Sequence, residues 1–209
     1  MVHTVAVLRC RALLVVVPAV LLLAGACSDD GRELAPVRPG QTTTSEPPPT
    51  IGSTGPAFAL TSGAFSDAGE IPARHTCDGE GVSPDLSWNG GPAGVELALV
   101  LRDRDANGYV HWMLTGIDPT ITAFGEGGVP EGAVEQVNAE GAIGYLPPCP
   151  PVGFGRHIYD FTLHVLAAPL RIDPEAPAAD VAAMIEAASI GRAQLSGTVD
   201  PDTPDAGSR

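Results

Sequence analysis

The sequence predicts a mainly β domain, an antiparallel sandwich or barrel with one helix near its C-terminus. Short apolar runs alternate with clusters of Gly, Pro, Asn and Asp, which is the pattern of strands joined by turns. The chain of 209 residues contains 25 Gly and 21 Pro, more than the elements of a helical bundle tolerate. Because loops rather than helices separate most of the apolar runs, antiparallel strands are expected instead of repeated strand-helix-strand units.

Seven apolar runs are expected to form strands, and one later segment is expected to form a helix. The predicted strands are 57–60, 86–88, 95–102, 110–117, 132–138, 158–166 and 192–199. In the helical segment, Asp173 can cap the N-terminus and Pro174 suits the first turn. The apolar residues that share one helix face are Val181, Met184, Ile185 and Ala188.

The charge of the chain limits its partners. There are 11 basic and 25 acidic residues, a formal net charge of −14, and every basic residue is Arg. Such a surface repels phosphate backbones, so we expect no nucleic-acid binding. The scatter of Gly and Pro excludes a coiled coil, and the presence of only one long apolar run excludes a multi-span membrane protein.

This apolar run lies at the N-terminus and is typical of an export signal. Two arginines precede the stretch 12–26, which is too short and too interrupted by proline for a transmembrane helix. Residues 23–27 (LAGAC) resemble the bacterial lipobox, although Leu23 stands one position further from Cys27 than usual. We expect lipidation of Cys27 and anchoring by that lipid at the outer face of the bacterial cell membrane. The alternatives are a plain signal peptide and an uncleaved anchor.

Composition divides the chain into four parts. They are a signal peptide (1–26), a flexible tether rich in Ser, Pro and Thr (27–56), a folded domain (57–200) and a disordered tail (201–209). The tether has almost no apolar periodicity and cannot bury enough surface to offset its ordering entropy. The folded part, about 144 residues, is one domain of common size.

Within that domain Cys77 and Cys149 are the only cysteines. Two thiols in an exported domain are more often bridged than free, so we expect a disulfide. The alternative is two separately buried thiols, because the sequence does not show whether their Cα atoms lie within bonding distance.

Most of the residues that could bind a ligand or take part in catalysis lie in two loops. After the strand 95–102, Asp103 and Asp105 lie on one side of an extended chain, and His111 opens the next strand. The second loop, 144–159, has four closely spaced prolines that fix φ, followed by glycines whose N–H groups can converge. This combination predicts a rigid rim with an anion-accepting floor.

The order of these residues resembles a known family. Asp103-x-Asp105, His111-Trp112, a proline-rich loop with Cys149, and His157 two residues before Tyr159 are similar to the phosphatidylethanolamine-binding protein (PEBP) or Raf kinase inhibitor-like family, most closely its bacterial YbhB/YbcL-type branch. Further matches are HTCDG (75–79), SPDLSW (83–88), PAG (92–94) and AQLSGT (193–198). The resemblance covers residues 58–199 and implies a Greek-key β-sandwich with a C-terminal helix.

Four positions depart from the family pattern. Arg104 and Asn107 stand where the family usually has prolines, Ile158 stands where arginine is usual, and Pro147 stands where glycine is common. These changes alter the stiffness of the first loop and one charged neighbour of the pocket. We therefore expect the mouth of the site to accept a different ligand than in relatives.

The resemblance implies a small anion pocket. Its residues are Asp103, Asp105, His111, Pro148, Pro150, Gly153, Gly155, His157 and Tyr159. The imidazoles can donate hydrogen bonds to a phosphate or carboxylate, and the tyrosine adds a neutral donor. The aspartates are expected to hold the imidazoles in a donating tautomer. The alternative is that both aspartates only fix the loop and His111 fills the strand interior.

Three functions remain open. The first is a non-catalytic module, tethered outside the membrane, that captures a small anionic ligand such as a phosphorylated head group. The second is an inhibitor or regulator of a kinase or protease, with which the family is associated, although the sequence shows no partner surface. The third is a hydrolase of small esters, although no catalytic motif is present. Two aspartates and two histidines also suit a divalent metal, but the resemblance implies neither a dedicated metal nor a cofactor.

Overall fold

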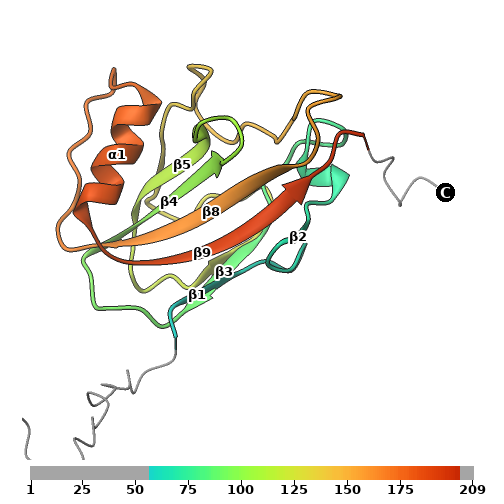
Figure 1. Cartoon of the computed structure of the whole chain (residues 1–209). Helices are drawn as coiled ribbons and strands as arrows, with labels where there is room; N and C mark the ends of the chain where they lie inside the picture. The colour runs from blue at the N-terminus through green and yellow to red at the C-terminus, as the bar shows by residue number, and fades with distance from the viewer. Residues whose placement is uncertain (1–56, 203–209) are drawn as a thin grey trace, which may run out of the picture. The chain divides into compact units, whose positions relative to one another are not determined.

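The computed structural model describes residues 57–202, which form two β-sheets and one α-helix (Figure 1). The smaller sheet has the order β1-β3-β6, with β1 Ala59–Thr61, β3 Leu86–Asn89 and β6 Ala123–Phe124. The larger has the order β2-β9-β8-β4-β5-β7, with β2 Gly69–Glu70, β9 Ser189–Val199, β8 His157–Leu166, β4 Glu96–Asp103, β5 Tyr109–Ile117 and β7 Val134–Glu135. The helix α1 is Ala178–Ala188, and a short 3-10 helix covers Ala73–His75. The predicted mainly β fold with a C-terminal helix is confirmed.

The N-terminal predictions fall outside this range. The signal peptide, Cys27 and the tether, together with residues 203–209 of the predicted tail, lie outside the described residues. Among residues 57–202, no helix has the length and apolar character needed to cross a membrane.

Four long antiparallel strands form the body of the larger sheet. Strand β4 pairs with β5 on one side and with β8 on the other, and β8 also pairs with β9. Seven of the eight residues of β4 are buried, as expected for a strand with neighbours on both edges and layers on both faces. The predicted ranges for these strands differ from the observed ones by one to three residues.

The short strands differ more from the prediction. The run 132–138 forms only the two-residue strand β7, and Gly132 has a φ of +81°, a left-handed conformation that does not continue a strand. Strand β2 pairs with β9 in parallel, so the antiparallel expectation is wrong for that pair. Both are edge strands, whose position depends on tertiary contacts more than on local pattern.

The larger sheet buries both faces, but with different partners. Strand β8 alternates, and Tyr159, Phe161 and Leu163 point into the core shared with the smaller sheet. On the outer face, α1 packs against Val100 of β4 and Met113 of β5. The helix therefore forms a third layer over part of the larger sheet (Figure 1).

Two details of the predicted helix are wrong. Pro177 occupies the N-cap position, while the Asp173 carboxylate accepts the Glu175 N–H within a preceding turn. Met184 is 39% exposed. The buried residues are Ala178, Val181, Ala182 and Ile185. The buried stripe is rotated from the predicted one because small alanines allow close approach to the sheet and Met184 falls one position to its side.

Candidate functional site

A cavity of about 250 Å³ lies where β4 ends and β8 begins. Its lining residues are Asp103, Ala106, Tyr109, His111, Glu140, Leu146, Pro147, Cys149, Pro150, Pro151, His157 and Tyr159. Five predicted site residues are therefore brought together: Asp103, His111, Pro150, His157 and Tyr159. We call this the histidine cavity.

The turn from β4 to β5 positions the first aspartate. Asp103 Oδ1 accepts the backbone N–H groups of Asp105 (2.9 Å) and Ala106 (3.1 Å), which fixes the turn. Asn107 has a φ of +55°, which proline cannot adopt and asparagine tolerates. The departure from the family pattern at position 107 thus follows from the conformation of this turn.

The other oxygen of Asp103 orients His157. Asp103 Oδ2 lies 2.7 Å from His157 Nδ1, and both side chains are buried. The register places Asp103 opposite Tyr159, next to His157 on β8. Since the carboxylate accepts the Nδ1 proton, Nε2 of a neutral His157 carries a lone pair, and it becomes a donor only when the ring is protonated.

His111 is oriented by backbone instead. Its Nδ1 donates to the Leu146 carbonyl at 3.0 Å. Burial, the largest cause, lowers the pKa of His111 below its ordinary value. Neither aspartate contacts this imidazole, and its neutral Nε2 is again an acceptor. The expectation that both aspartates hold the imidazoles in a donating tautomer is therefore wrong, because the donating form of each ring is the protonated one.

Tyr159 supplies the neutral donor. Its side chain is fully buried, and its hydroxyl makes no hydrogen bond of good geometry among residues 57–202, although the Asp103 carboxylate and the Cys149 backbone lie near it. Burial first, and then the Asp103 carboxylate, raise the pKa of Tyr159, so the group stays a phenol at physiological pH. The His111 ring meets the Tyr159 ring edge to face, with centroids 5.2 Å apart. The Tyr159 ring thus lies beside the rings of both histidines, with the His157 centroid 6.4 Å away.

The proline-rich loop forms one wall, and a disulfide holds it. Cys77 and Cys149 are bridged, with Cα atoms 5.4 Å apart, as expected from the sequence. The Cys77 N–H also donates to the Pro148 carbonyl at 3.0 Å. The bridge therefore fixes the segment after the 3-10 helix against this wall.

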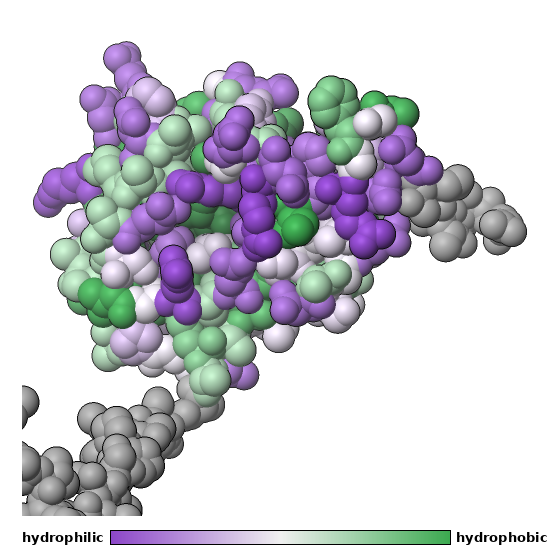
Figure 2. Space-filling view, in the orientation of Figure 1, coloured by the Kyte–Doolittle hydropathy of each residue, from purple (hydrophilic) through white to green (hydrophobic). Residues whose placement is uncertain are grey.

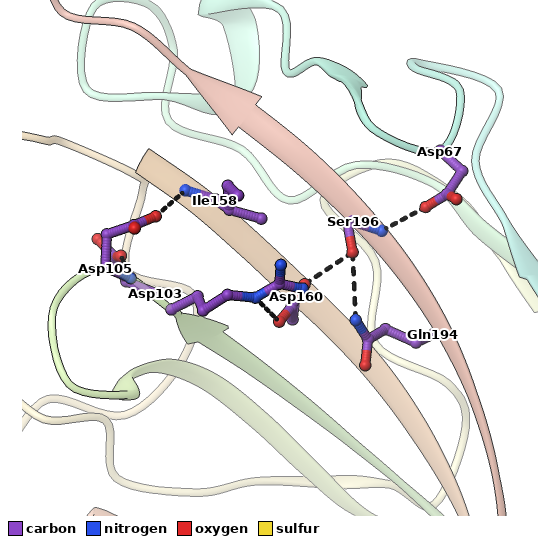
Figure 3. A network of polar contacts seen from close by, with 8 residues as sticks. Asp67, Asp103, Asp105, Ile158, Asp160, Gln194 and Ser196 are labelled. Atoms are coloured by element: carbon purple, nitrogen blue, oxygen red, sulfur yellow. Dashed lines mark hydrogen bonds and ion pairs between the residues drawn. The ribbon is translucent and has the colours of Figure 1, made fainter. Parts of the chain in front are cut away.

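Four predicted residues do not line the cavity: Asp105, Pro148, Gly153 and Gly155. Asp105 Oδ2 accepts the Ile158 N–H at 2.7 Å, which joins the turn to β8 (Figure 3). The Gly153 N–H donates to Asp202 Oδ1 at 3.1 Å, so it does not form an anion-binding floor. Both glycines have positive φ and serve the path of the loop.

The prediction missed several lining residues: Ala106, Tyr109, Glu140, Leu146 and Pro147. Alternation along β5 was a usable signal for Tyr109, which lies two residues before His111 on the same face. No sequence signal marks Glu140. It reaches the cavity because the neighbouring Ala139 N–H donates to the Val110 carbonyl at 2.9 Å.

The arrangement can bind and position groups, with few options for covalent chemistry. The cavity lining contains no serine or threonine hydroxyl, and its one cysteine is in the disulfide. Within residues 57–202, no cluster of three or more His, Cys, Asp or Glu side chains is suited to a metal ion. What the lining offers is a phenol donor, two imidazoles with fixed tautomers, and two carboxylates.

The fold defines a class of two-sheet β proteins with one C-terminal helix. The family model described as phosphatidylethanolamine-binding protein matches residues 61–205, and the chain belongs to that family. Two crystal structures of family members have a similar fold. The PEBP homologue CT736 of Chlamydia trachomatis is 32% identical, with a TM-score of 0.62, and the match covers 70% of this chain and 99% of that one. YbcL of E. coli is 28% identical, with a TM-score of 0.63, over 68% and 96%.

Two curated relatives are similar in sequence, and one of them matches well beyond the folded domain. A protein named "Putative lipoprotein LppC" from Mycobacterium tuberculosis (strain ATCC 25618 / H37Rv) is 37% identical over 185 residues, which are 86% of this chain and 91% of the relative. A UPF0098 protein of Methanothermobacter thermautotrophicus is 42% identical over 142 residues, 64% of this chain and 93% of the relative.

Proposed function

We propose that this protein is a binding module that captures a small anionic ligand of the phosphate or phospholipid-head-group type in the histidine cavity. The observation that carries the proposal is the Tyr159 hydroxyl, which is buried at the cavity and makes no hydrogen bond of good geometry among residues 57–202. A buried polar group left unpaired costs roughly 1 to 3 kcal/mol, and a ligand oxygen would recover that cost. His111 and His157 add charged donors when they are protonated.

The carboxylates of the site favour a zwitterionic head group over a bare phosphate. Glu140 lines the cavity beside Tyr109, whose pKa is raised by burial and then by the Glu140 charge. A carboxylate next to an aromatic ring is a suitable site for an ammonium group. We propose that the phosphate contacts Tyr159 and the histidines while the ammonium contacts Glu140.

A lipid anchor at Cys27 would hold this module at the cell envelope. The relative named as a lipoprotein aligns over 86% of the chain, which supports the same attachment here. We propose that the protein is anchored at the outer face of the bacterial cell membrane, where head groups are accessible to the domain.

One observation favours a second candidate, a hydrolase of small esters. The Asp103 carboxylate holds His157 with Nε2 available, as in an oriented general base. The only hydroxyls in the cavity lining are those of tyrosines, however, and burial raises the pKa of both. Binding without turnover therefore fits the residues better.

Calorimetric titration of the full-length chain in detergent tests the proposal, with phosphoethanolamine and inorganic phosphate as probes. Tyr159→Phe removes only the hydroxyl, so we expect at least a tenfold loss of phosphoethanolamine affinity without loss of thermal stability. Glu140→Gln should lower the affinity for phosphoethanolamine and leave the affinity for inorganic phosphate unchanged or higher. Equal affinity of wild type and Tyr159→Phe would overturn the assignment, and release of product from a phosphoester or acyl-ester probe would favour the hydrolase.

A further inference from the structure

A second concave surface lies on the outer face of the larger sheet, beside α1. Its volume is about 290 Å³. The residues that line it on β4, β8 and β9 lie in three cross-strand rows: Arg102 and Asp160, then Val100, Thr162 and Gln194, then His164 and Arg192. Figure 2 shows hydrophilic side chains gathered across the face over β8 and β9. Since α1 covers only part of this face, the remainder is a polar hollow.

Three of the chain's 11 arginines gather here, although the net charge is −14. Arg104 is paired, because its Nε and one of its two terminal nitrogens donate to the two oxygens of Asp160 at 2.9 and 2.7 Å. Asp160 also accepts the Ser196 hydroxyl at 2.7 Å (Figure 3). Arg104 and Asp160 thus neutralise each other and form one rigid wall of the hollow.

The other two arginines retain free donors. Arg102 contacts the Glu186 carboxylate of α1 at 3.0 Å, but its Nε is buried and has no acceptor among residues 57–202. Arg192 makes no ion pair within the same part of the chain. A guanidinium presents a planar fork of N–H groups that matches a carboxylate or phosphate. Two such forks face one hollow, in which Glu186 is the only lining carboxylate that Arg104 does not already pair with.

The pKa of His164 reflects its burial and the positive charges around the hollow. His164 is buried on β8 next to Arg192, and burial, then the charges of Arg192 and Arg102, lower its pKa to about 4. The ring is therefore neutral at pH 7, and the two arginine charges are not matched by the carboxylate of Glu186 alone.

We propose that this hollow, defined by Arg102, His164, Arg192 and Gln194, is a second binding site that takes an anionic group, a carboxylate or a phosphate, of a small molecule. Glu186 already shows that Arg102 accepts a carboxylate here. Its side chain is 47% exposed and lies near the C-terminal end of α1, where the helix dipole disfavours a negative charge. A ligand anion can therefore replace Glu186 on Arg102 at small cost. We call this hollow the outer-face site.

The outer-face site is separate from the histidine cavity. Along β8, His157 and Tyr159 point to one side of the sheet and Asp160 and His164 to the other. The proposal thus does not depend on the function proposed for the histidine cavity, and variants can separate the two.

NMR titration of the isotope-labelled full-length chain in detergent tests the outer-face site, with sulfate and succinate as probes. We expect saturable shifts of the Nε–H signals of Arg102 and Arg192 and a rise in the pKa of His164. Arg192→Gln should weaken this binding at least tenfold. The matched control Arg171→Gln, which removes the same charge from an exposed arginine before α1, should leave it unchanged.

The outcomes are distinct. Saturation with succinate alone assigns a carboxylate ligand, saturation with sulfate alone assigns a phosphate-like one, and either supports the site. Absence of saturation at Arg102 and Arg192, or equal weakening by Arg171→Gln, would overturn it. His157→Ala should not change these shifts, and their loss in that variant would place the anion in the histidine cavity instead.

Discussion

Asp103 of β4 holds His157 of β8 through a 2.7 Å contact between Oδ2 and Nδ1, with both side chains buried. The same carboxylate fixes the β4–β5 turn through its other oxygen. One side chain therefore couples the shape of the hairpin to the proton position on the imidazole. This coupling underlies the first prediction.

Replacing His157 should weaken the histidine cavity without abolishing the fold. We expect His157→Ala to reduce phosphoethanolamine affinity by roughly 1.5 to 3 kcal/mol, the value of a hydrogen bond to a charged group. Calorimetry measures the loss. Both proteins are measured in the Arg192→Gln background, which silences the outer-face site, and in that background the control His164→Gln, a buried histidine on the other face of β8, should bind normally. Equal affinities of wild type and His157→Ala would return His157 to a structural role.

Anion affinity of the histidine cavity should rise toward acid pH. Because burial lowers the pKa of His111, its protonation and the added Nε2–H donor come below the ordinary value of about 6.5. One coupled proton allows at most about a tenfold gain per pH unit. Sulfate, which keeps its charge, is titrated at pH 5, 6 and 7 in the Arg192→Gln background to isolate this cavity. His111→Gln should flatten the profile, and a flat profile in the parent would contradict the proposal.

The long strands and half of the site follow from the sequence because they depend on local alternation. Asp103, His111 and Tyr159 lie at strand ends, where period two fixes their side of the sheet. Asp105 shows where this reasoning fails. Alternation places it beside Asp103, but the turn that follows, with positive φ at Asn107 and Gly108, directs its carboxylate to the Ile158 N–H.

The loop residues of the site could not be predicted from the sequence, for a different reason. Glu140 comes to the cavity through a backbone hydrogen bond between segments nearly thirty residues apart, and no short-range pattern encodes such a contact. The prediction of the helix cap was wrong for a similar reason, since Asp173 forms a local turn that competes with helix capping. Arg104 was visible as a departure from the family, but its partner Asp160 lies on another strand.

Removing the disulfide should destabilise the domain and loosen the cavity wall. Cys77 and Cys149 are 72 positions apart, and a bridge over such a loop contributes roughly 4 kcal/mol as an upper figure. The Cys77→Ala/Cys149→Ala variant should lose up to that amount in urea unfolding and bind phosphoethanolamine more weakly. Reductant should destabilise wild type and leave the variant unchanged. Recovery of both thiols free by non-reducing peptide mapping of the exported protein would contradict the bridge.

Lipidation is tested at Cys27, outside the described residues. Cys27→Ser should abolish partitioning into detergent phase while the domain keeps its thermal unfolding transition, because the acyl chains provide the membrane affinity. Cys10→Ser, in the predicted signal peptide, is the matched control and should partition as wild type. A Cys27→Ser protein that stays in the detergent phase would indicate an uncleaved apolar anchor.

His164 should make the stability of the domain depend on pH. Its pKa is about 4 in the folded chain and about 6.5 when unfolded, so the unfolded state binds more protons between these values. The free energy of unfolding therefore rises with pH across this window and falls as the solution is acidified. We expect this contribution to be about 2 kcal/mol, since solvent near the arginines screens part of it. Urea unfolding of wild type and His164→Gln at pH 5 and pH 7 measures it. The variant should lose less stability than wild type on acidification, and parallel losses in both proteins would show that another group carries the effect.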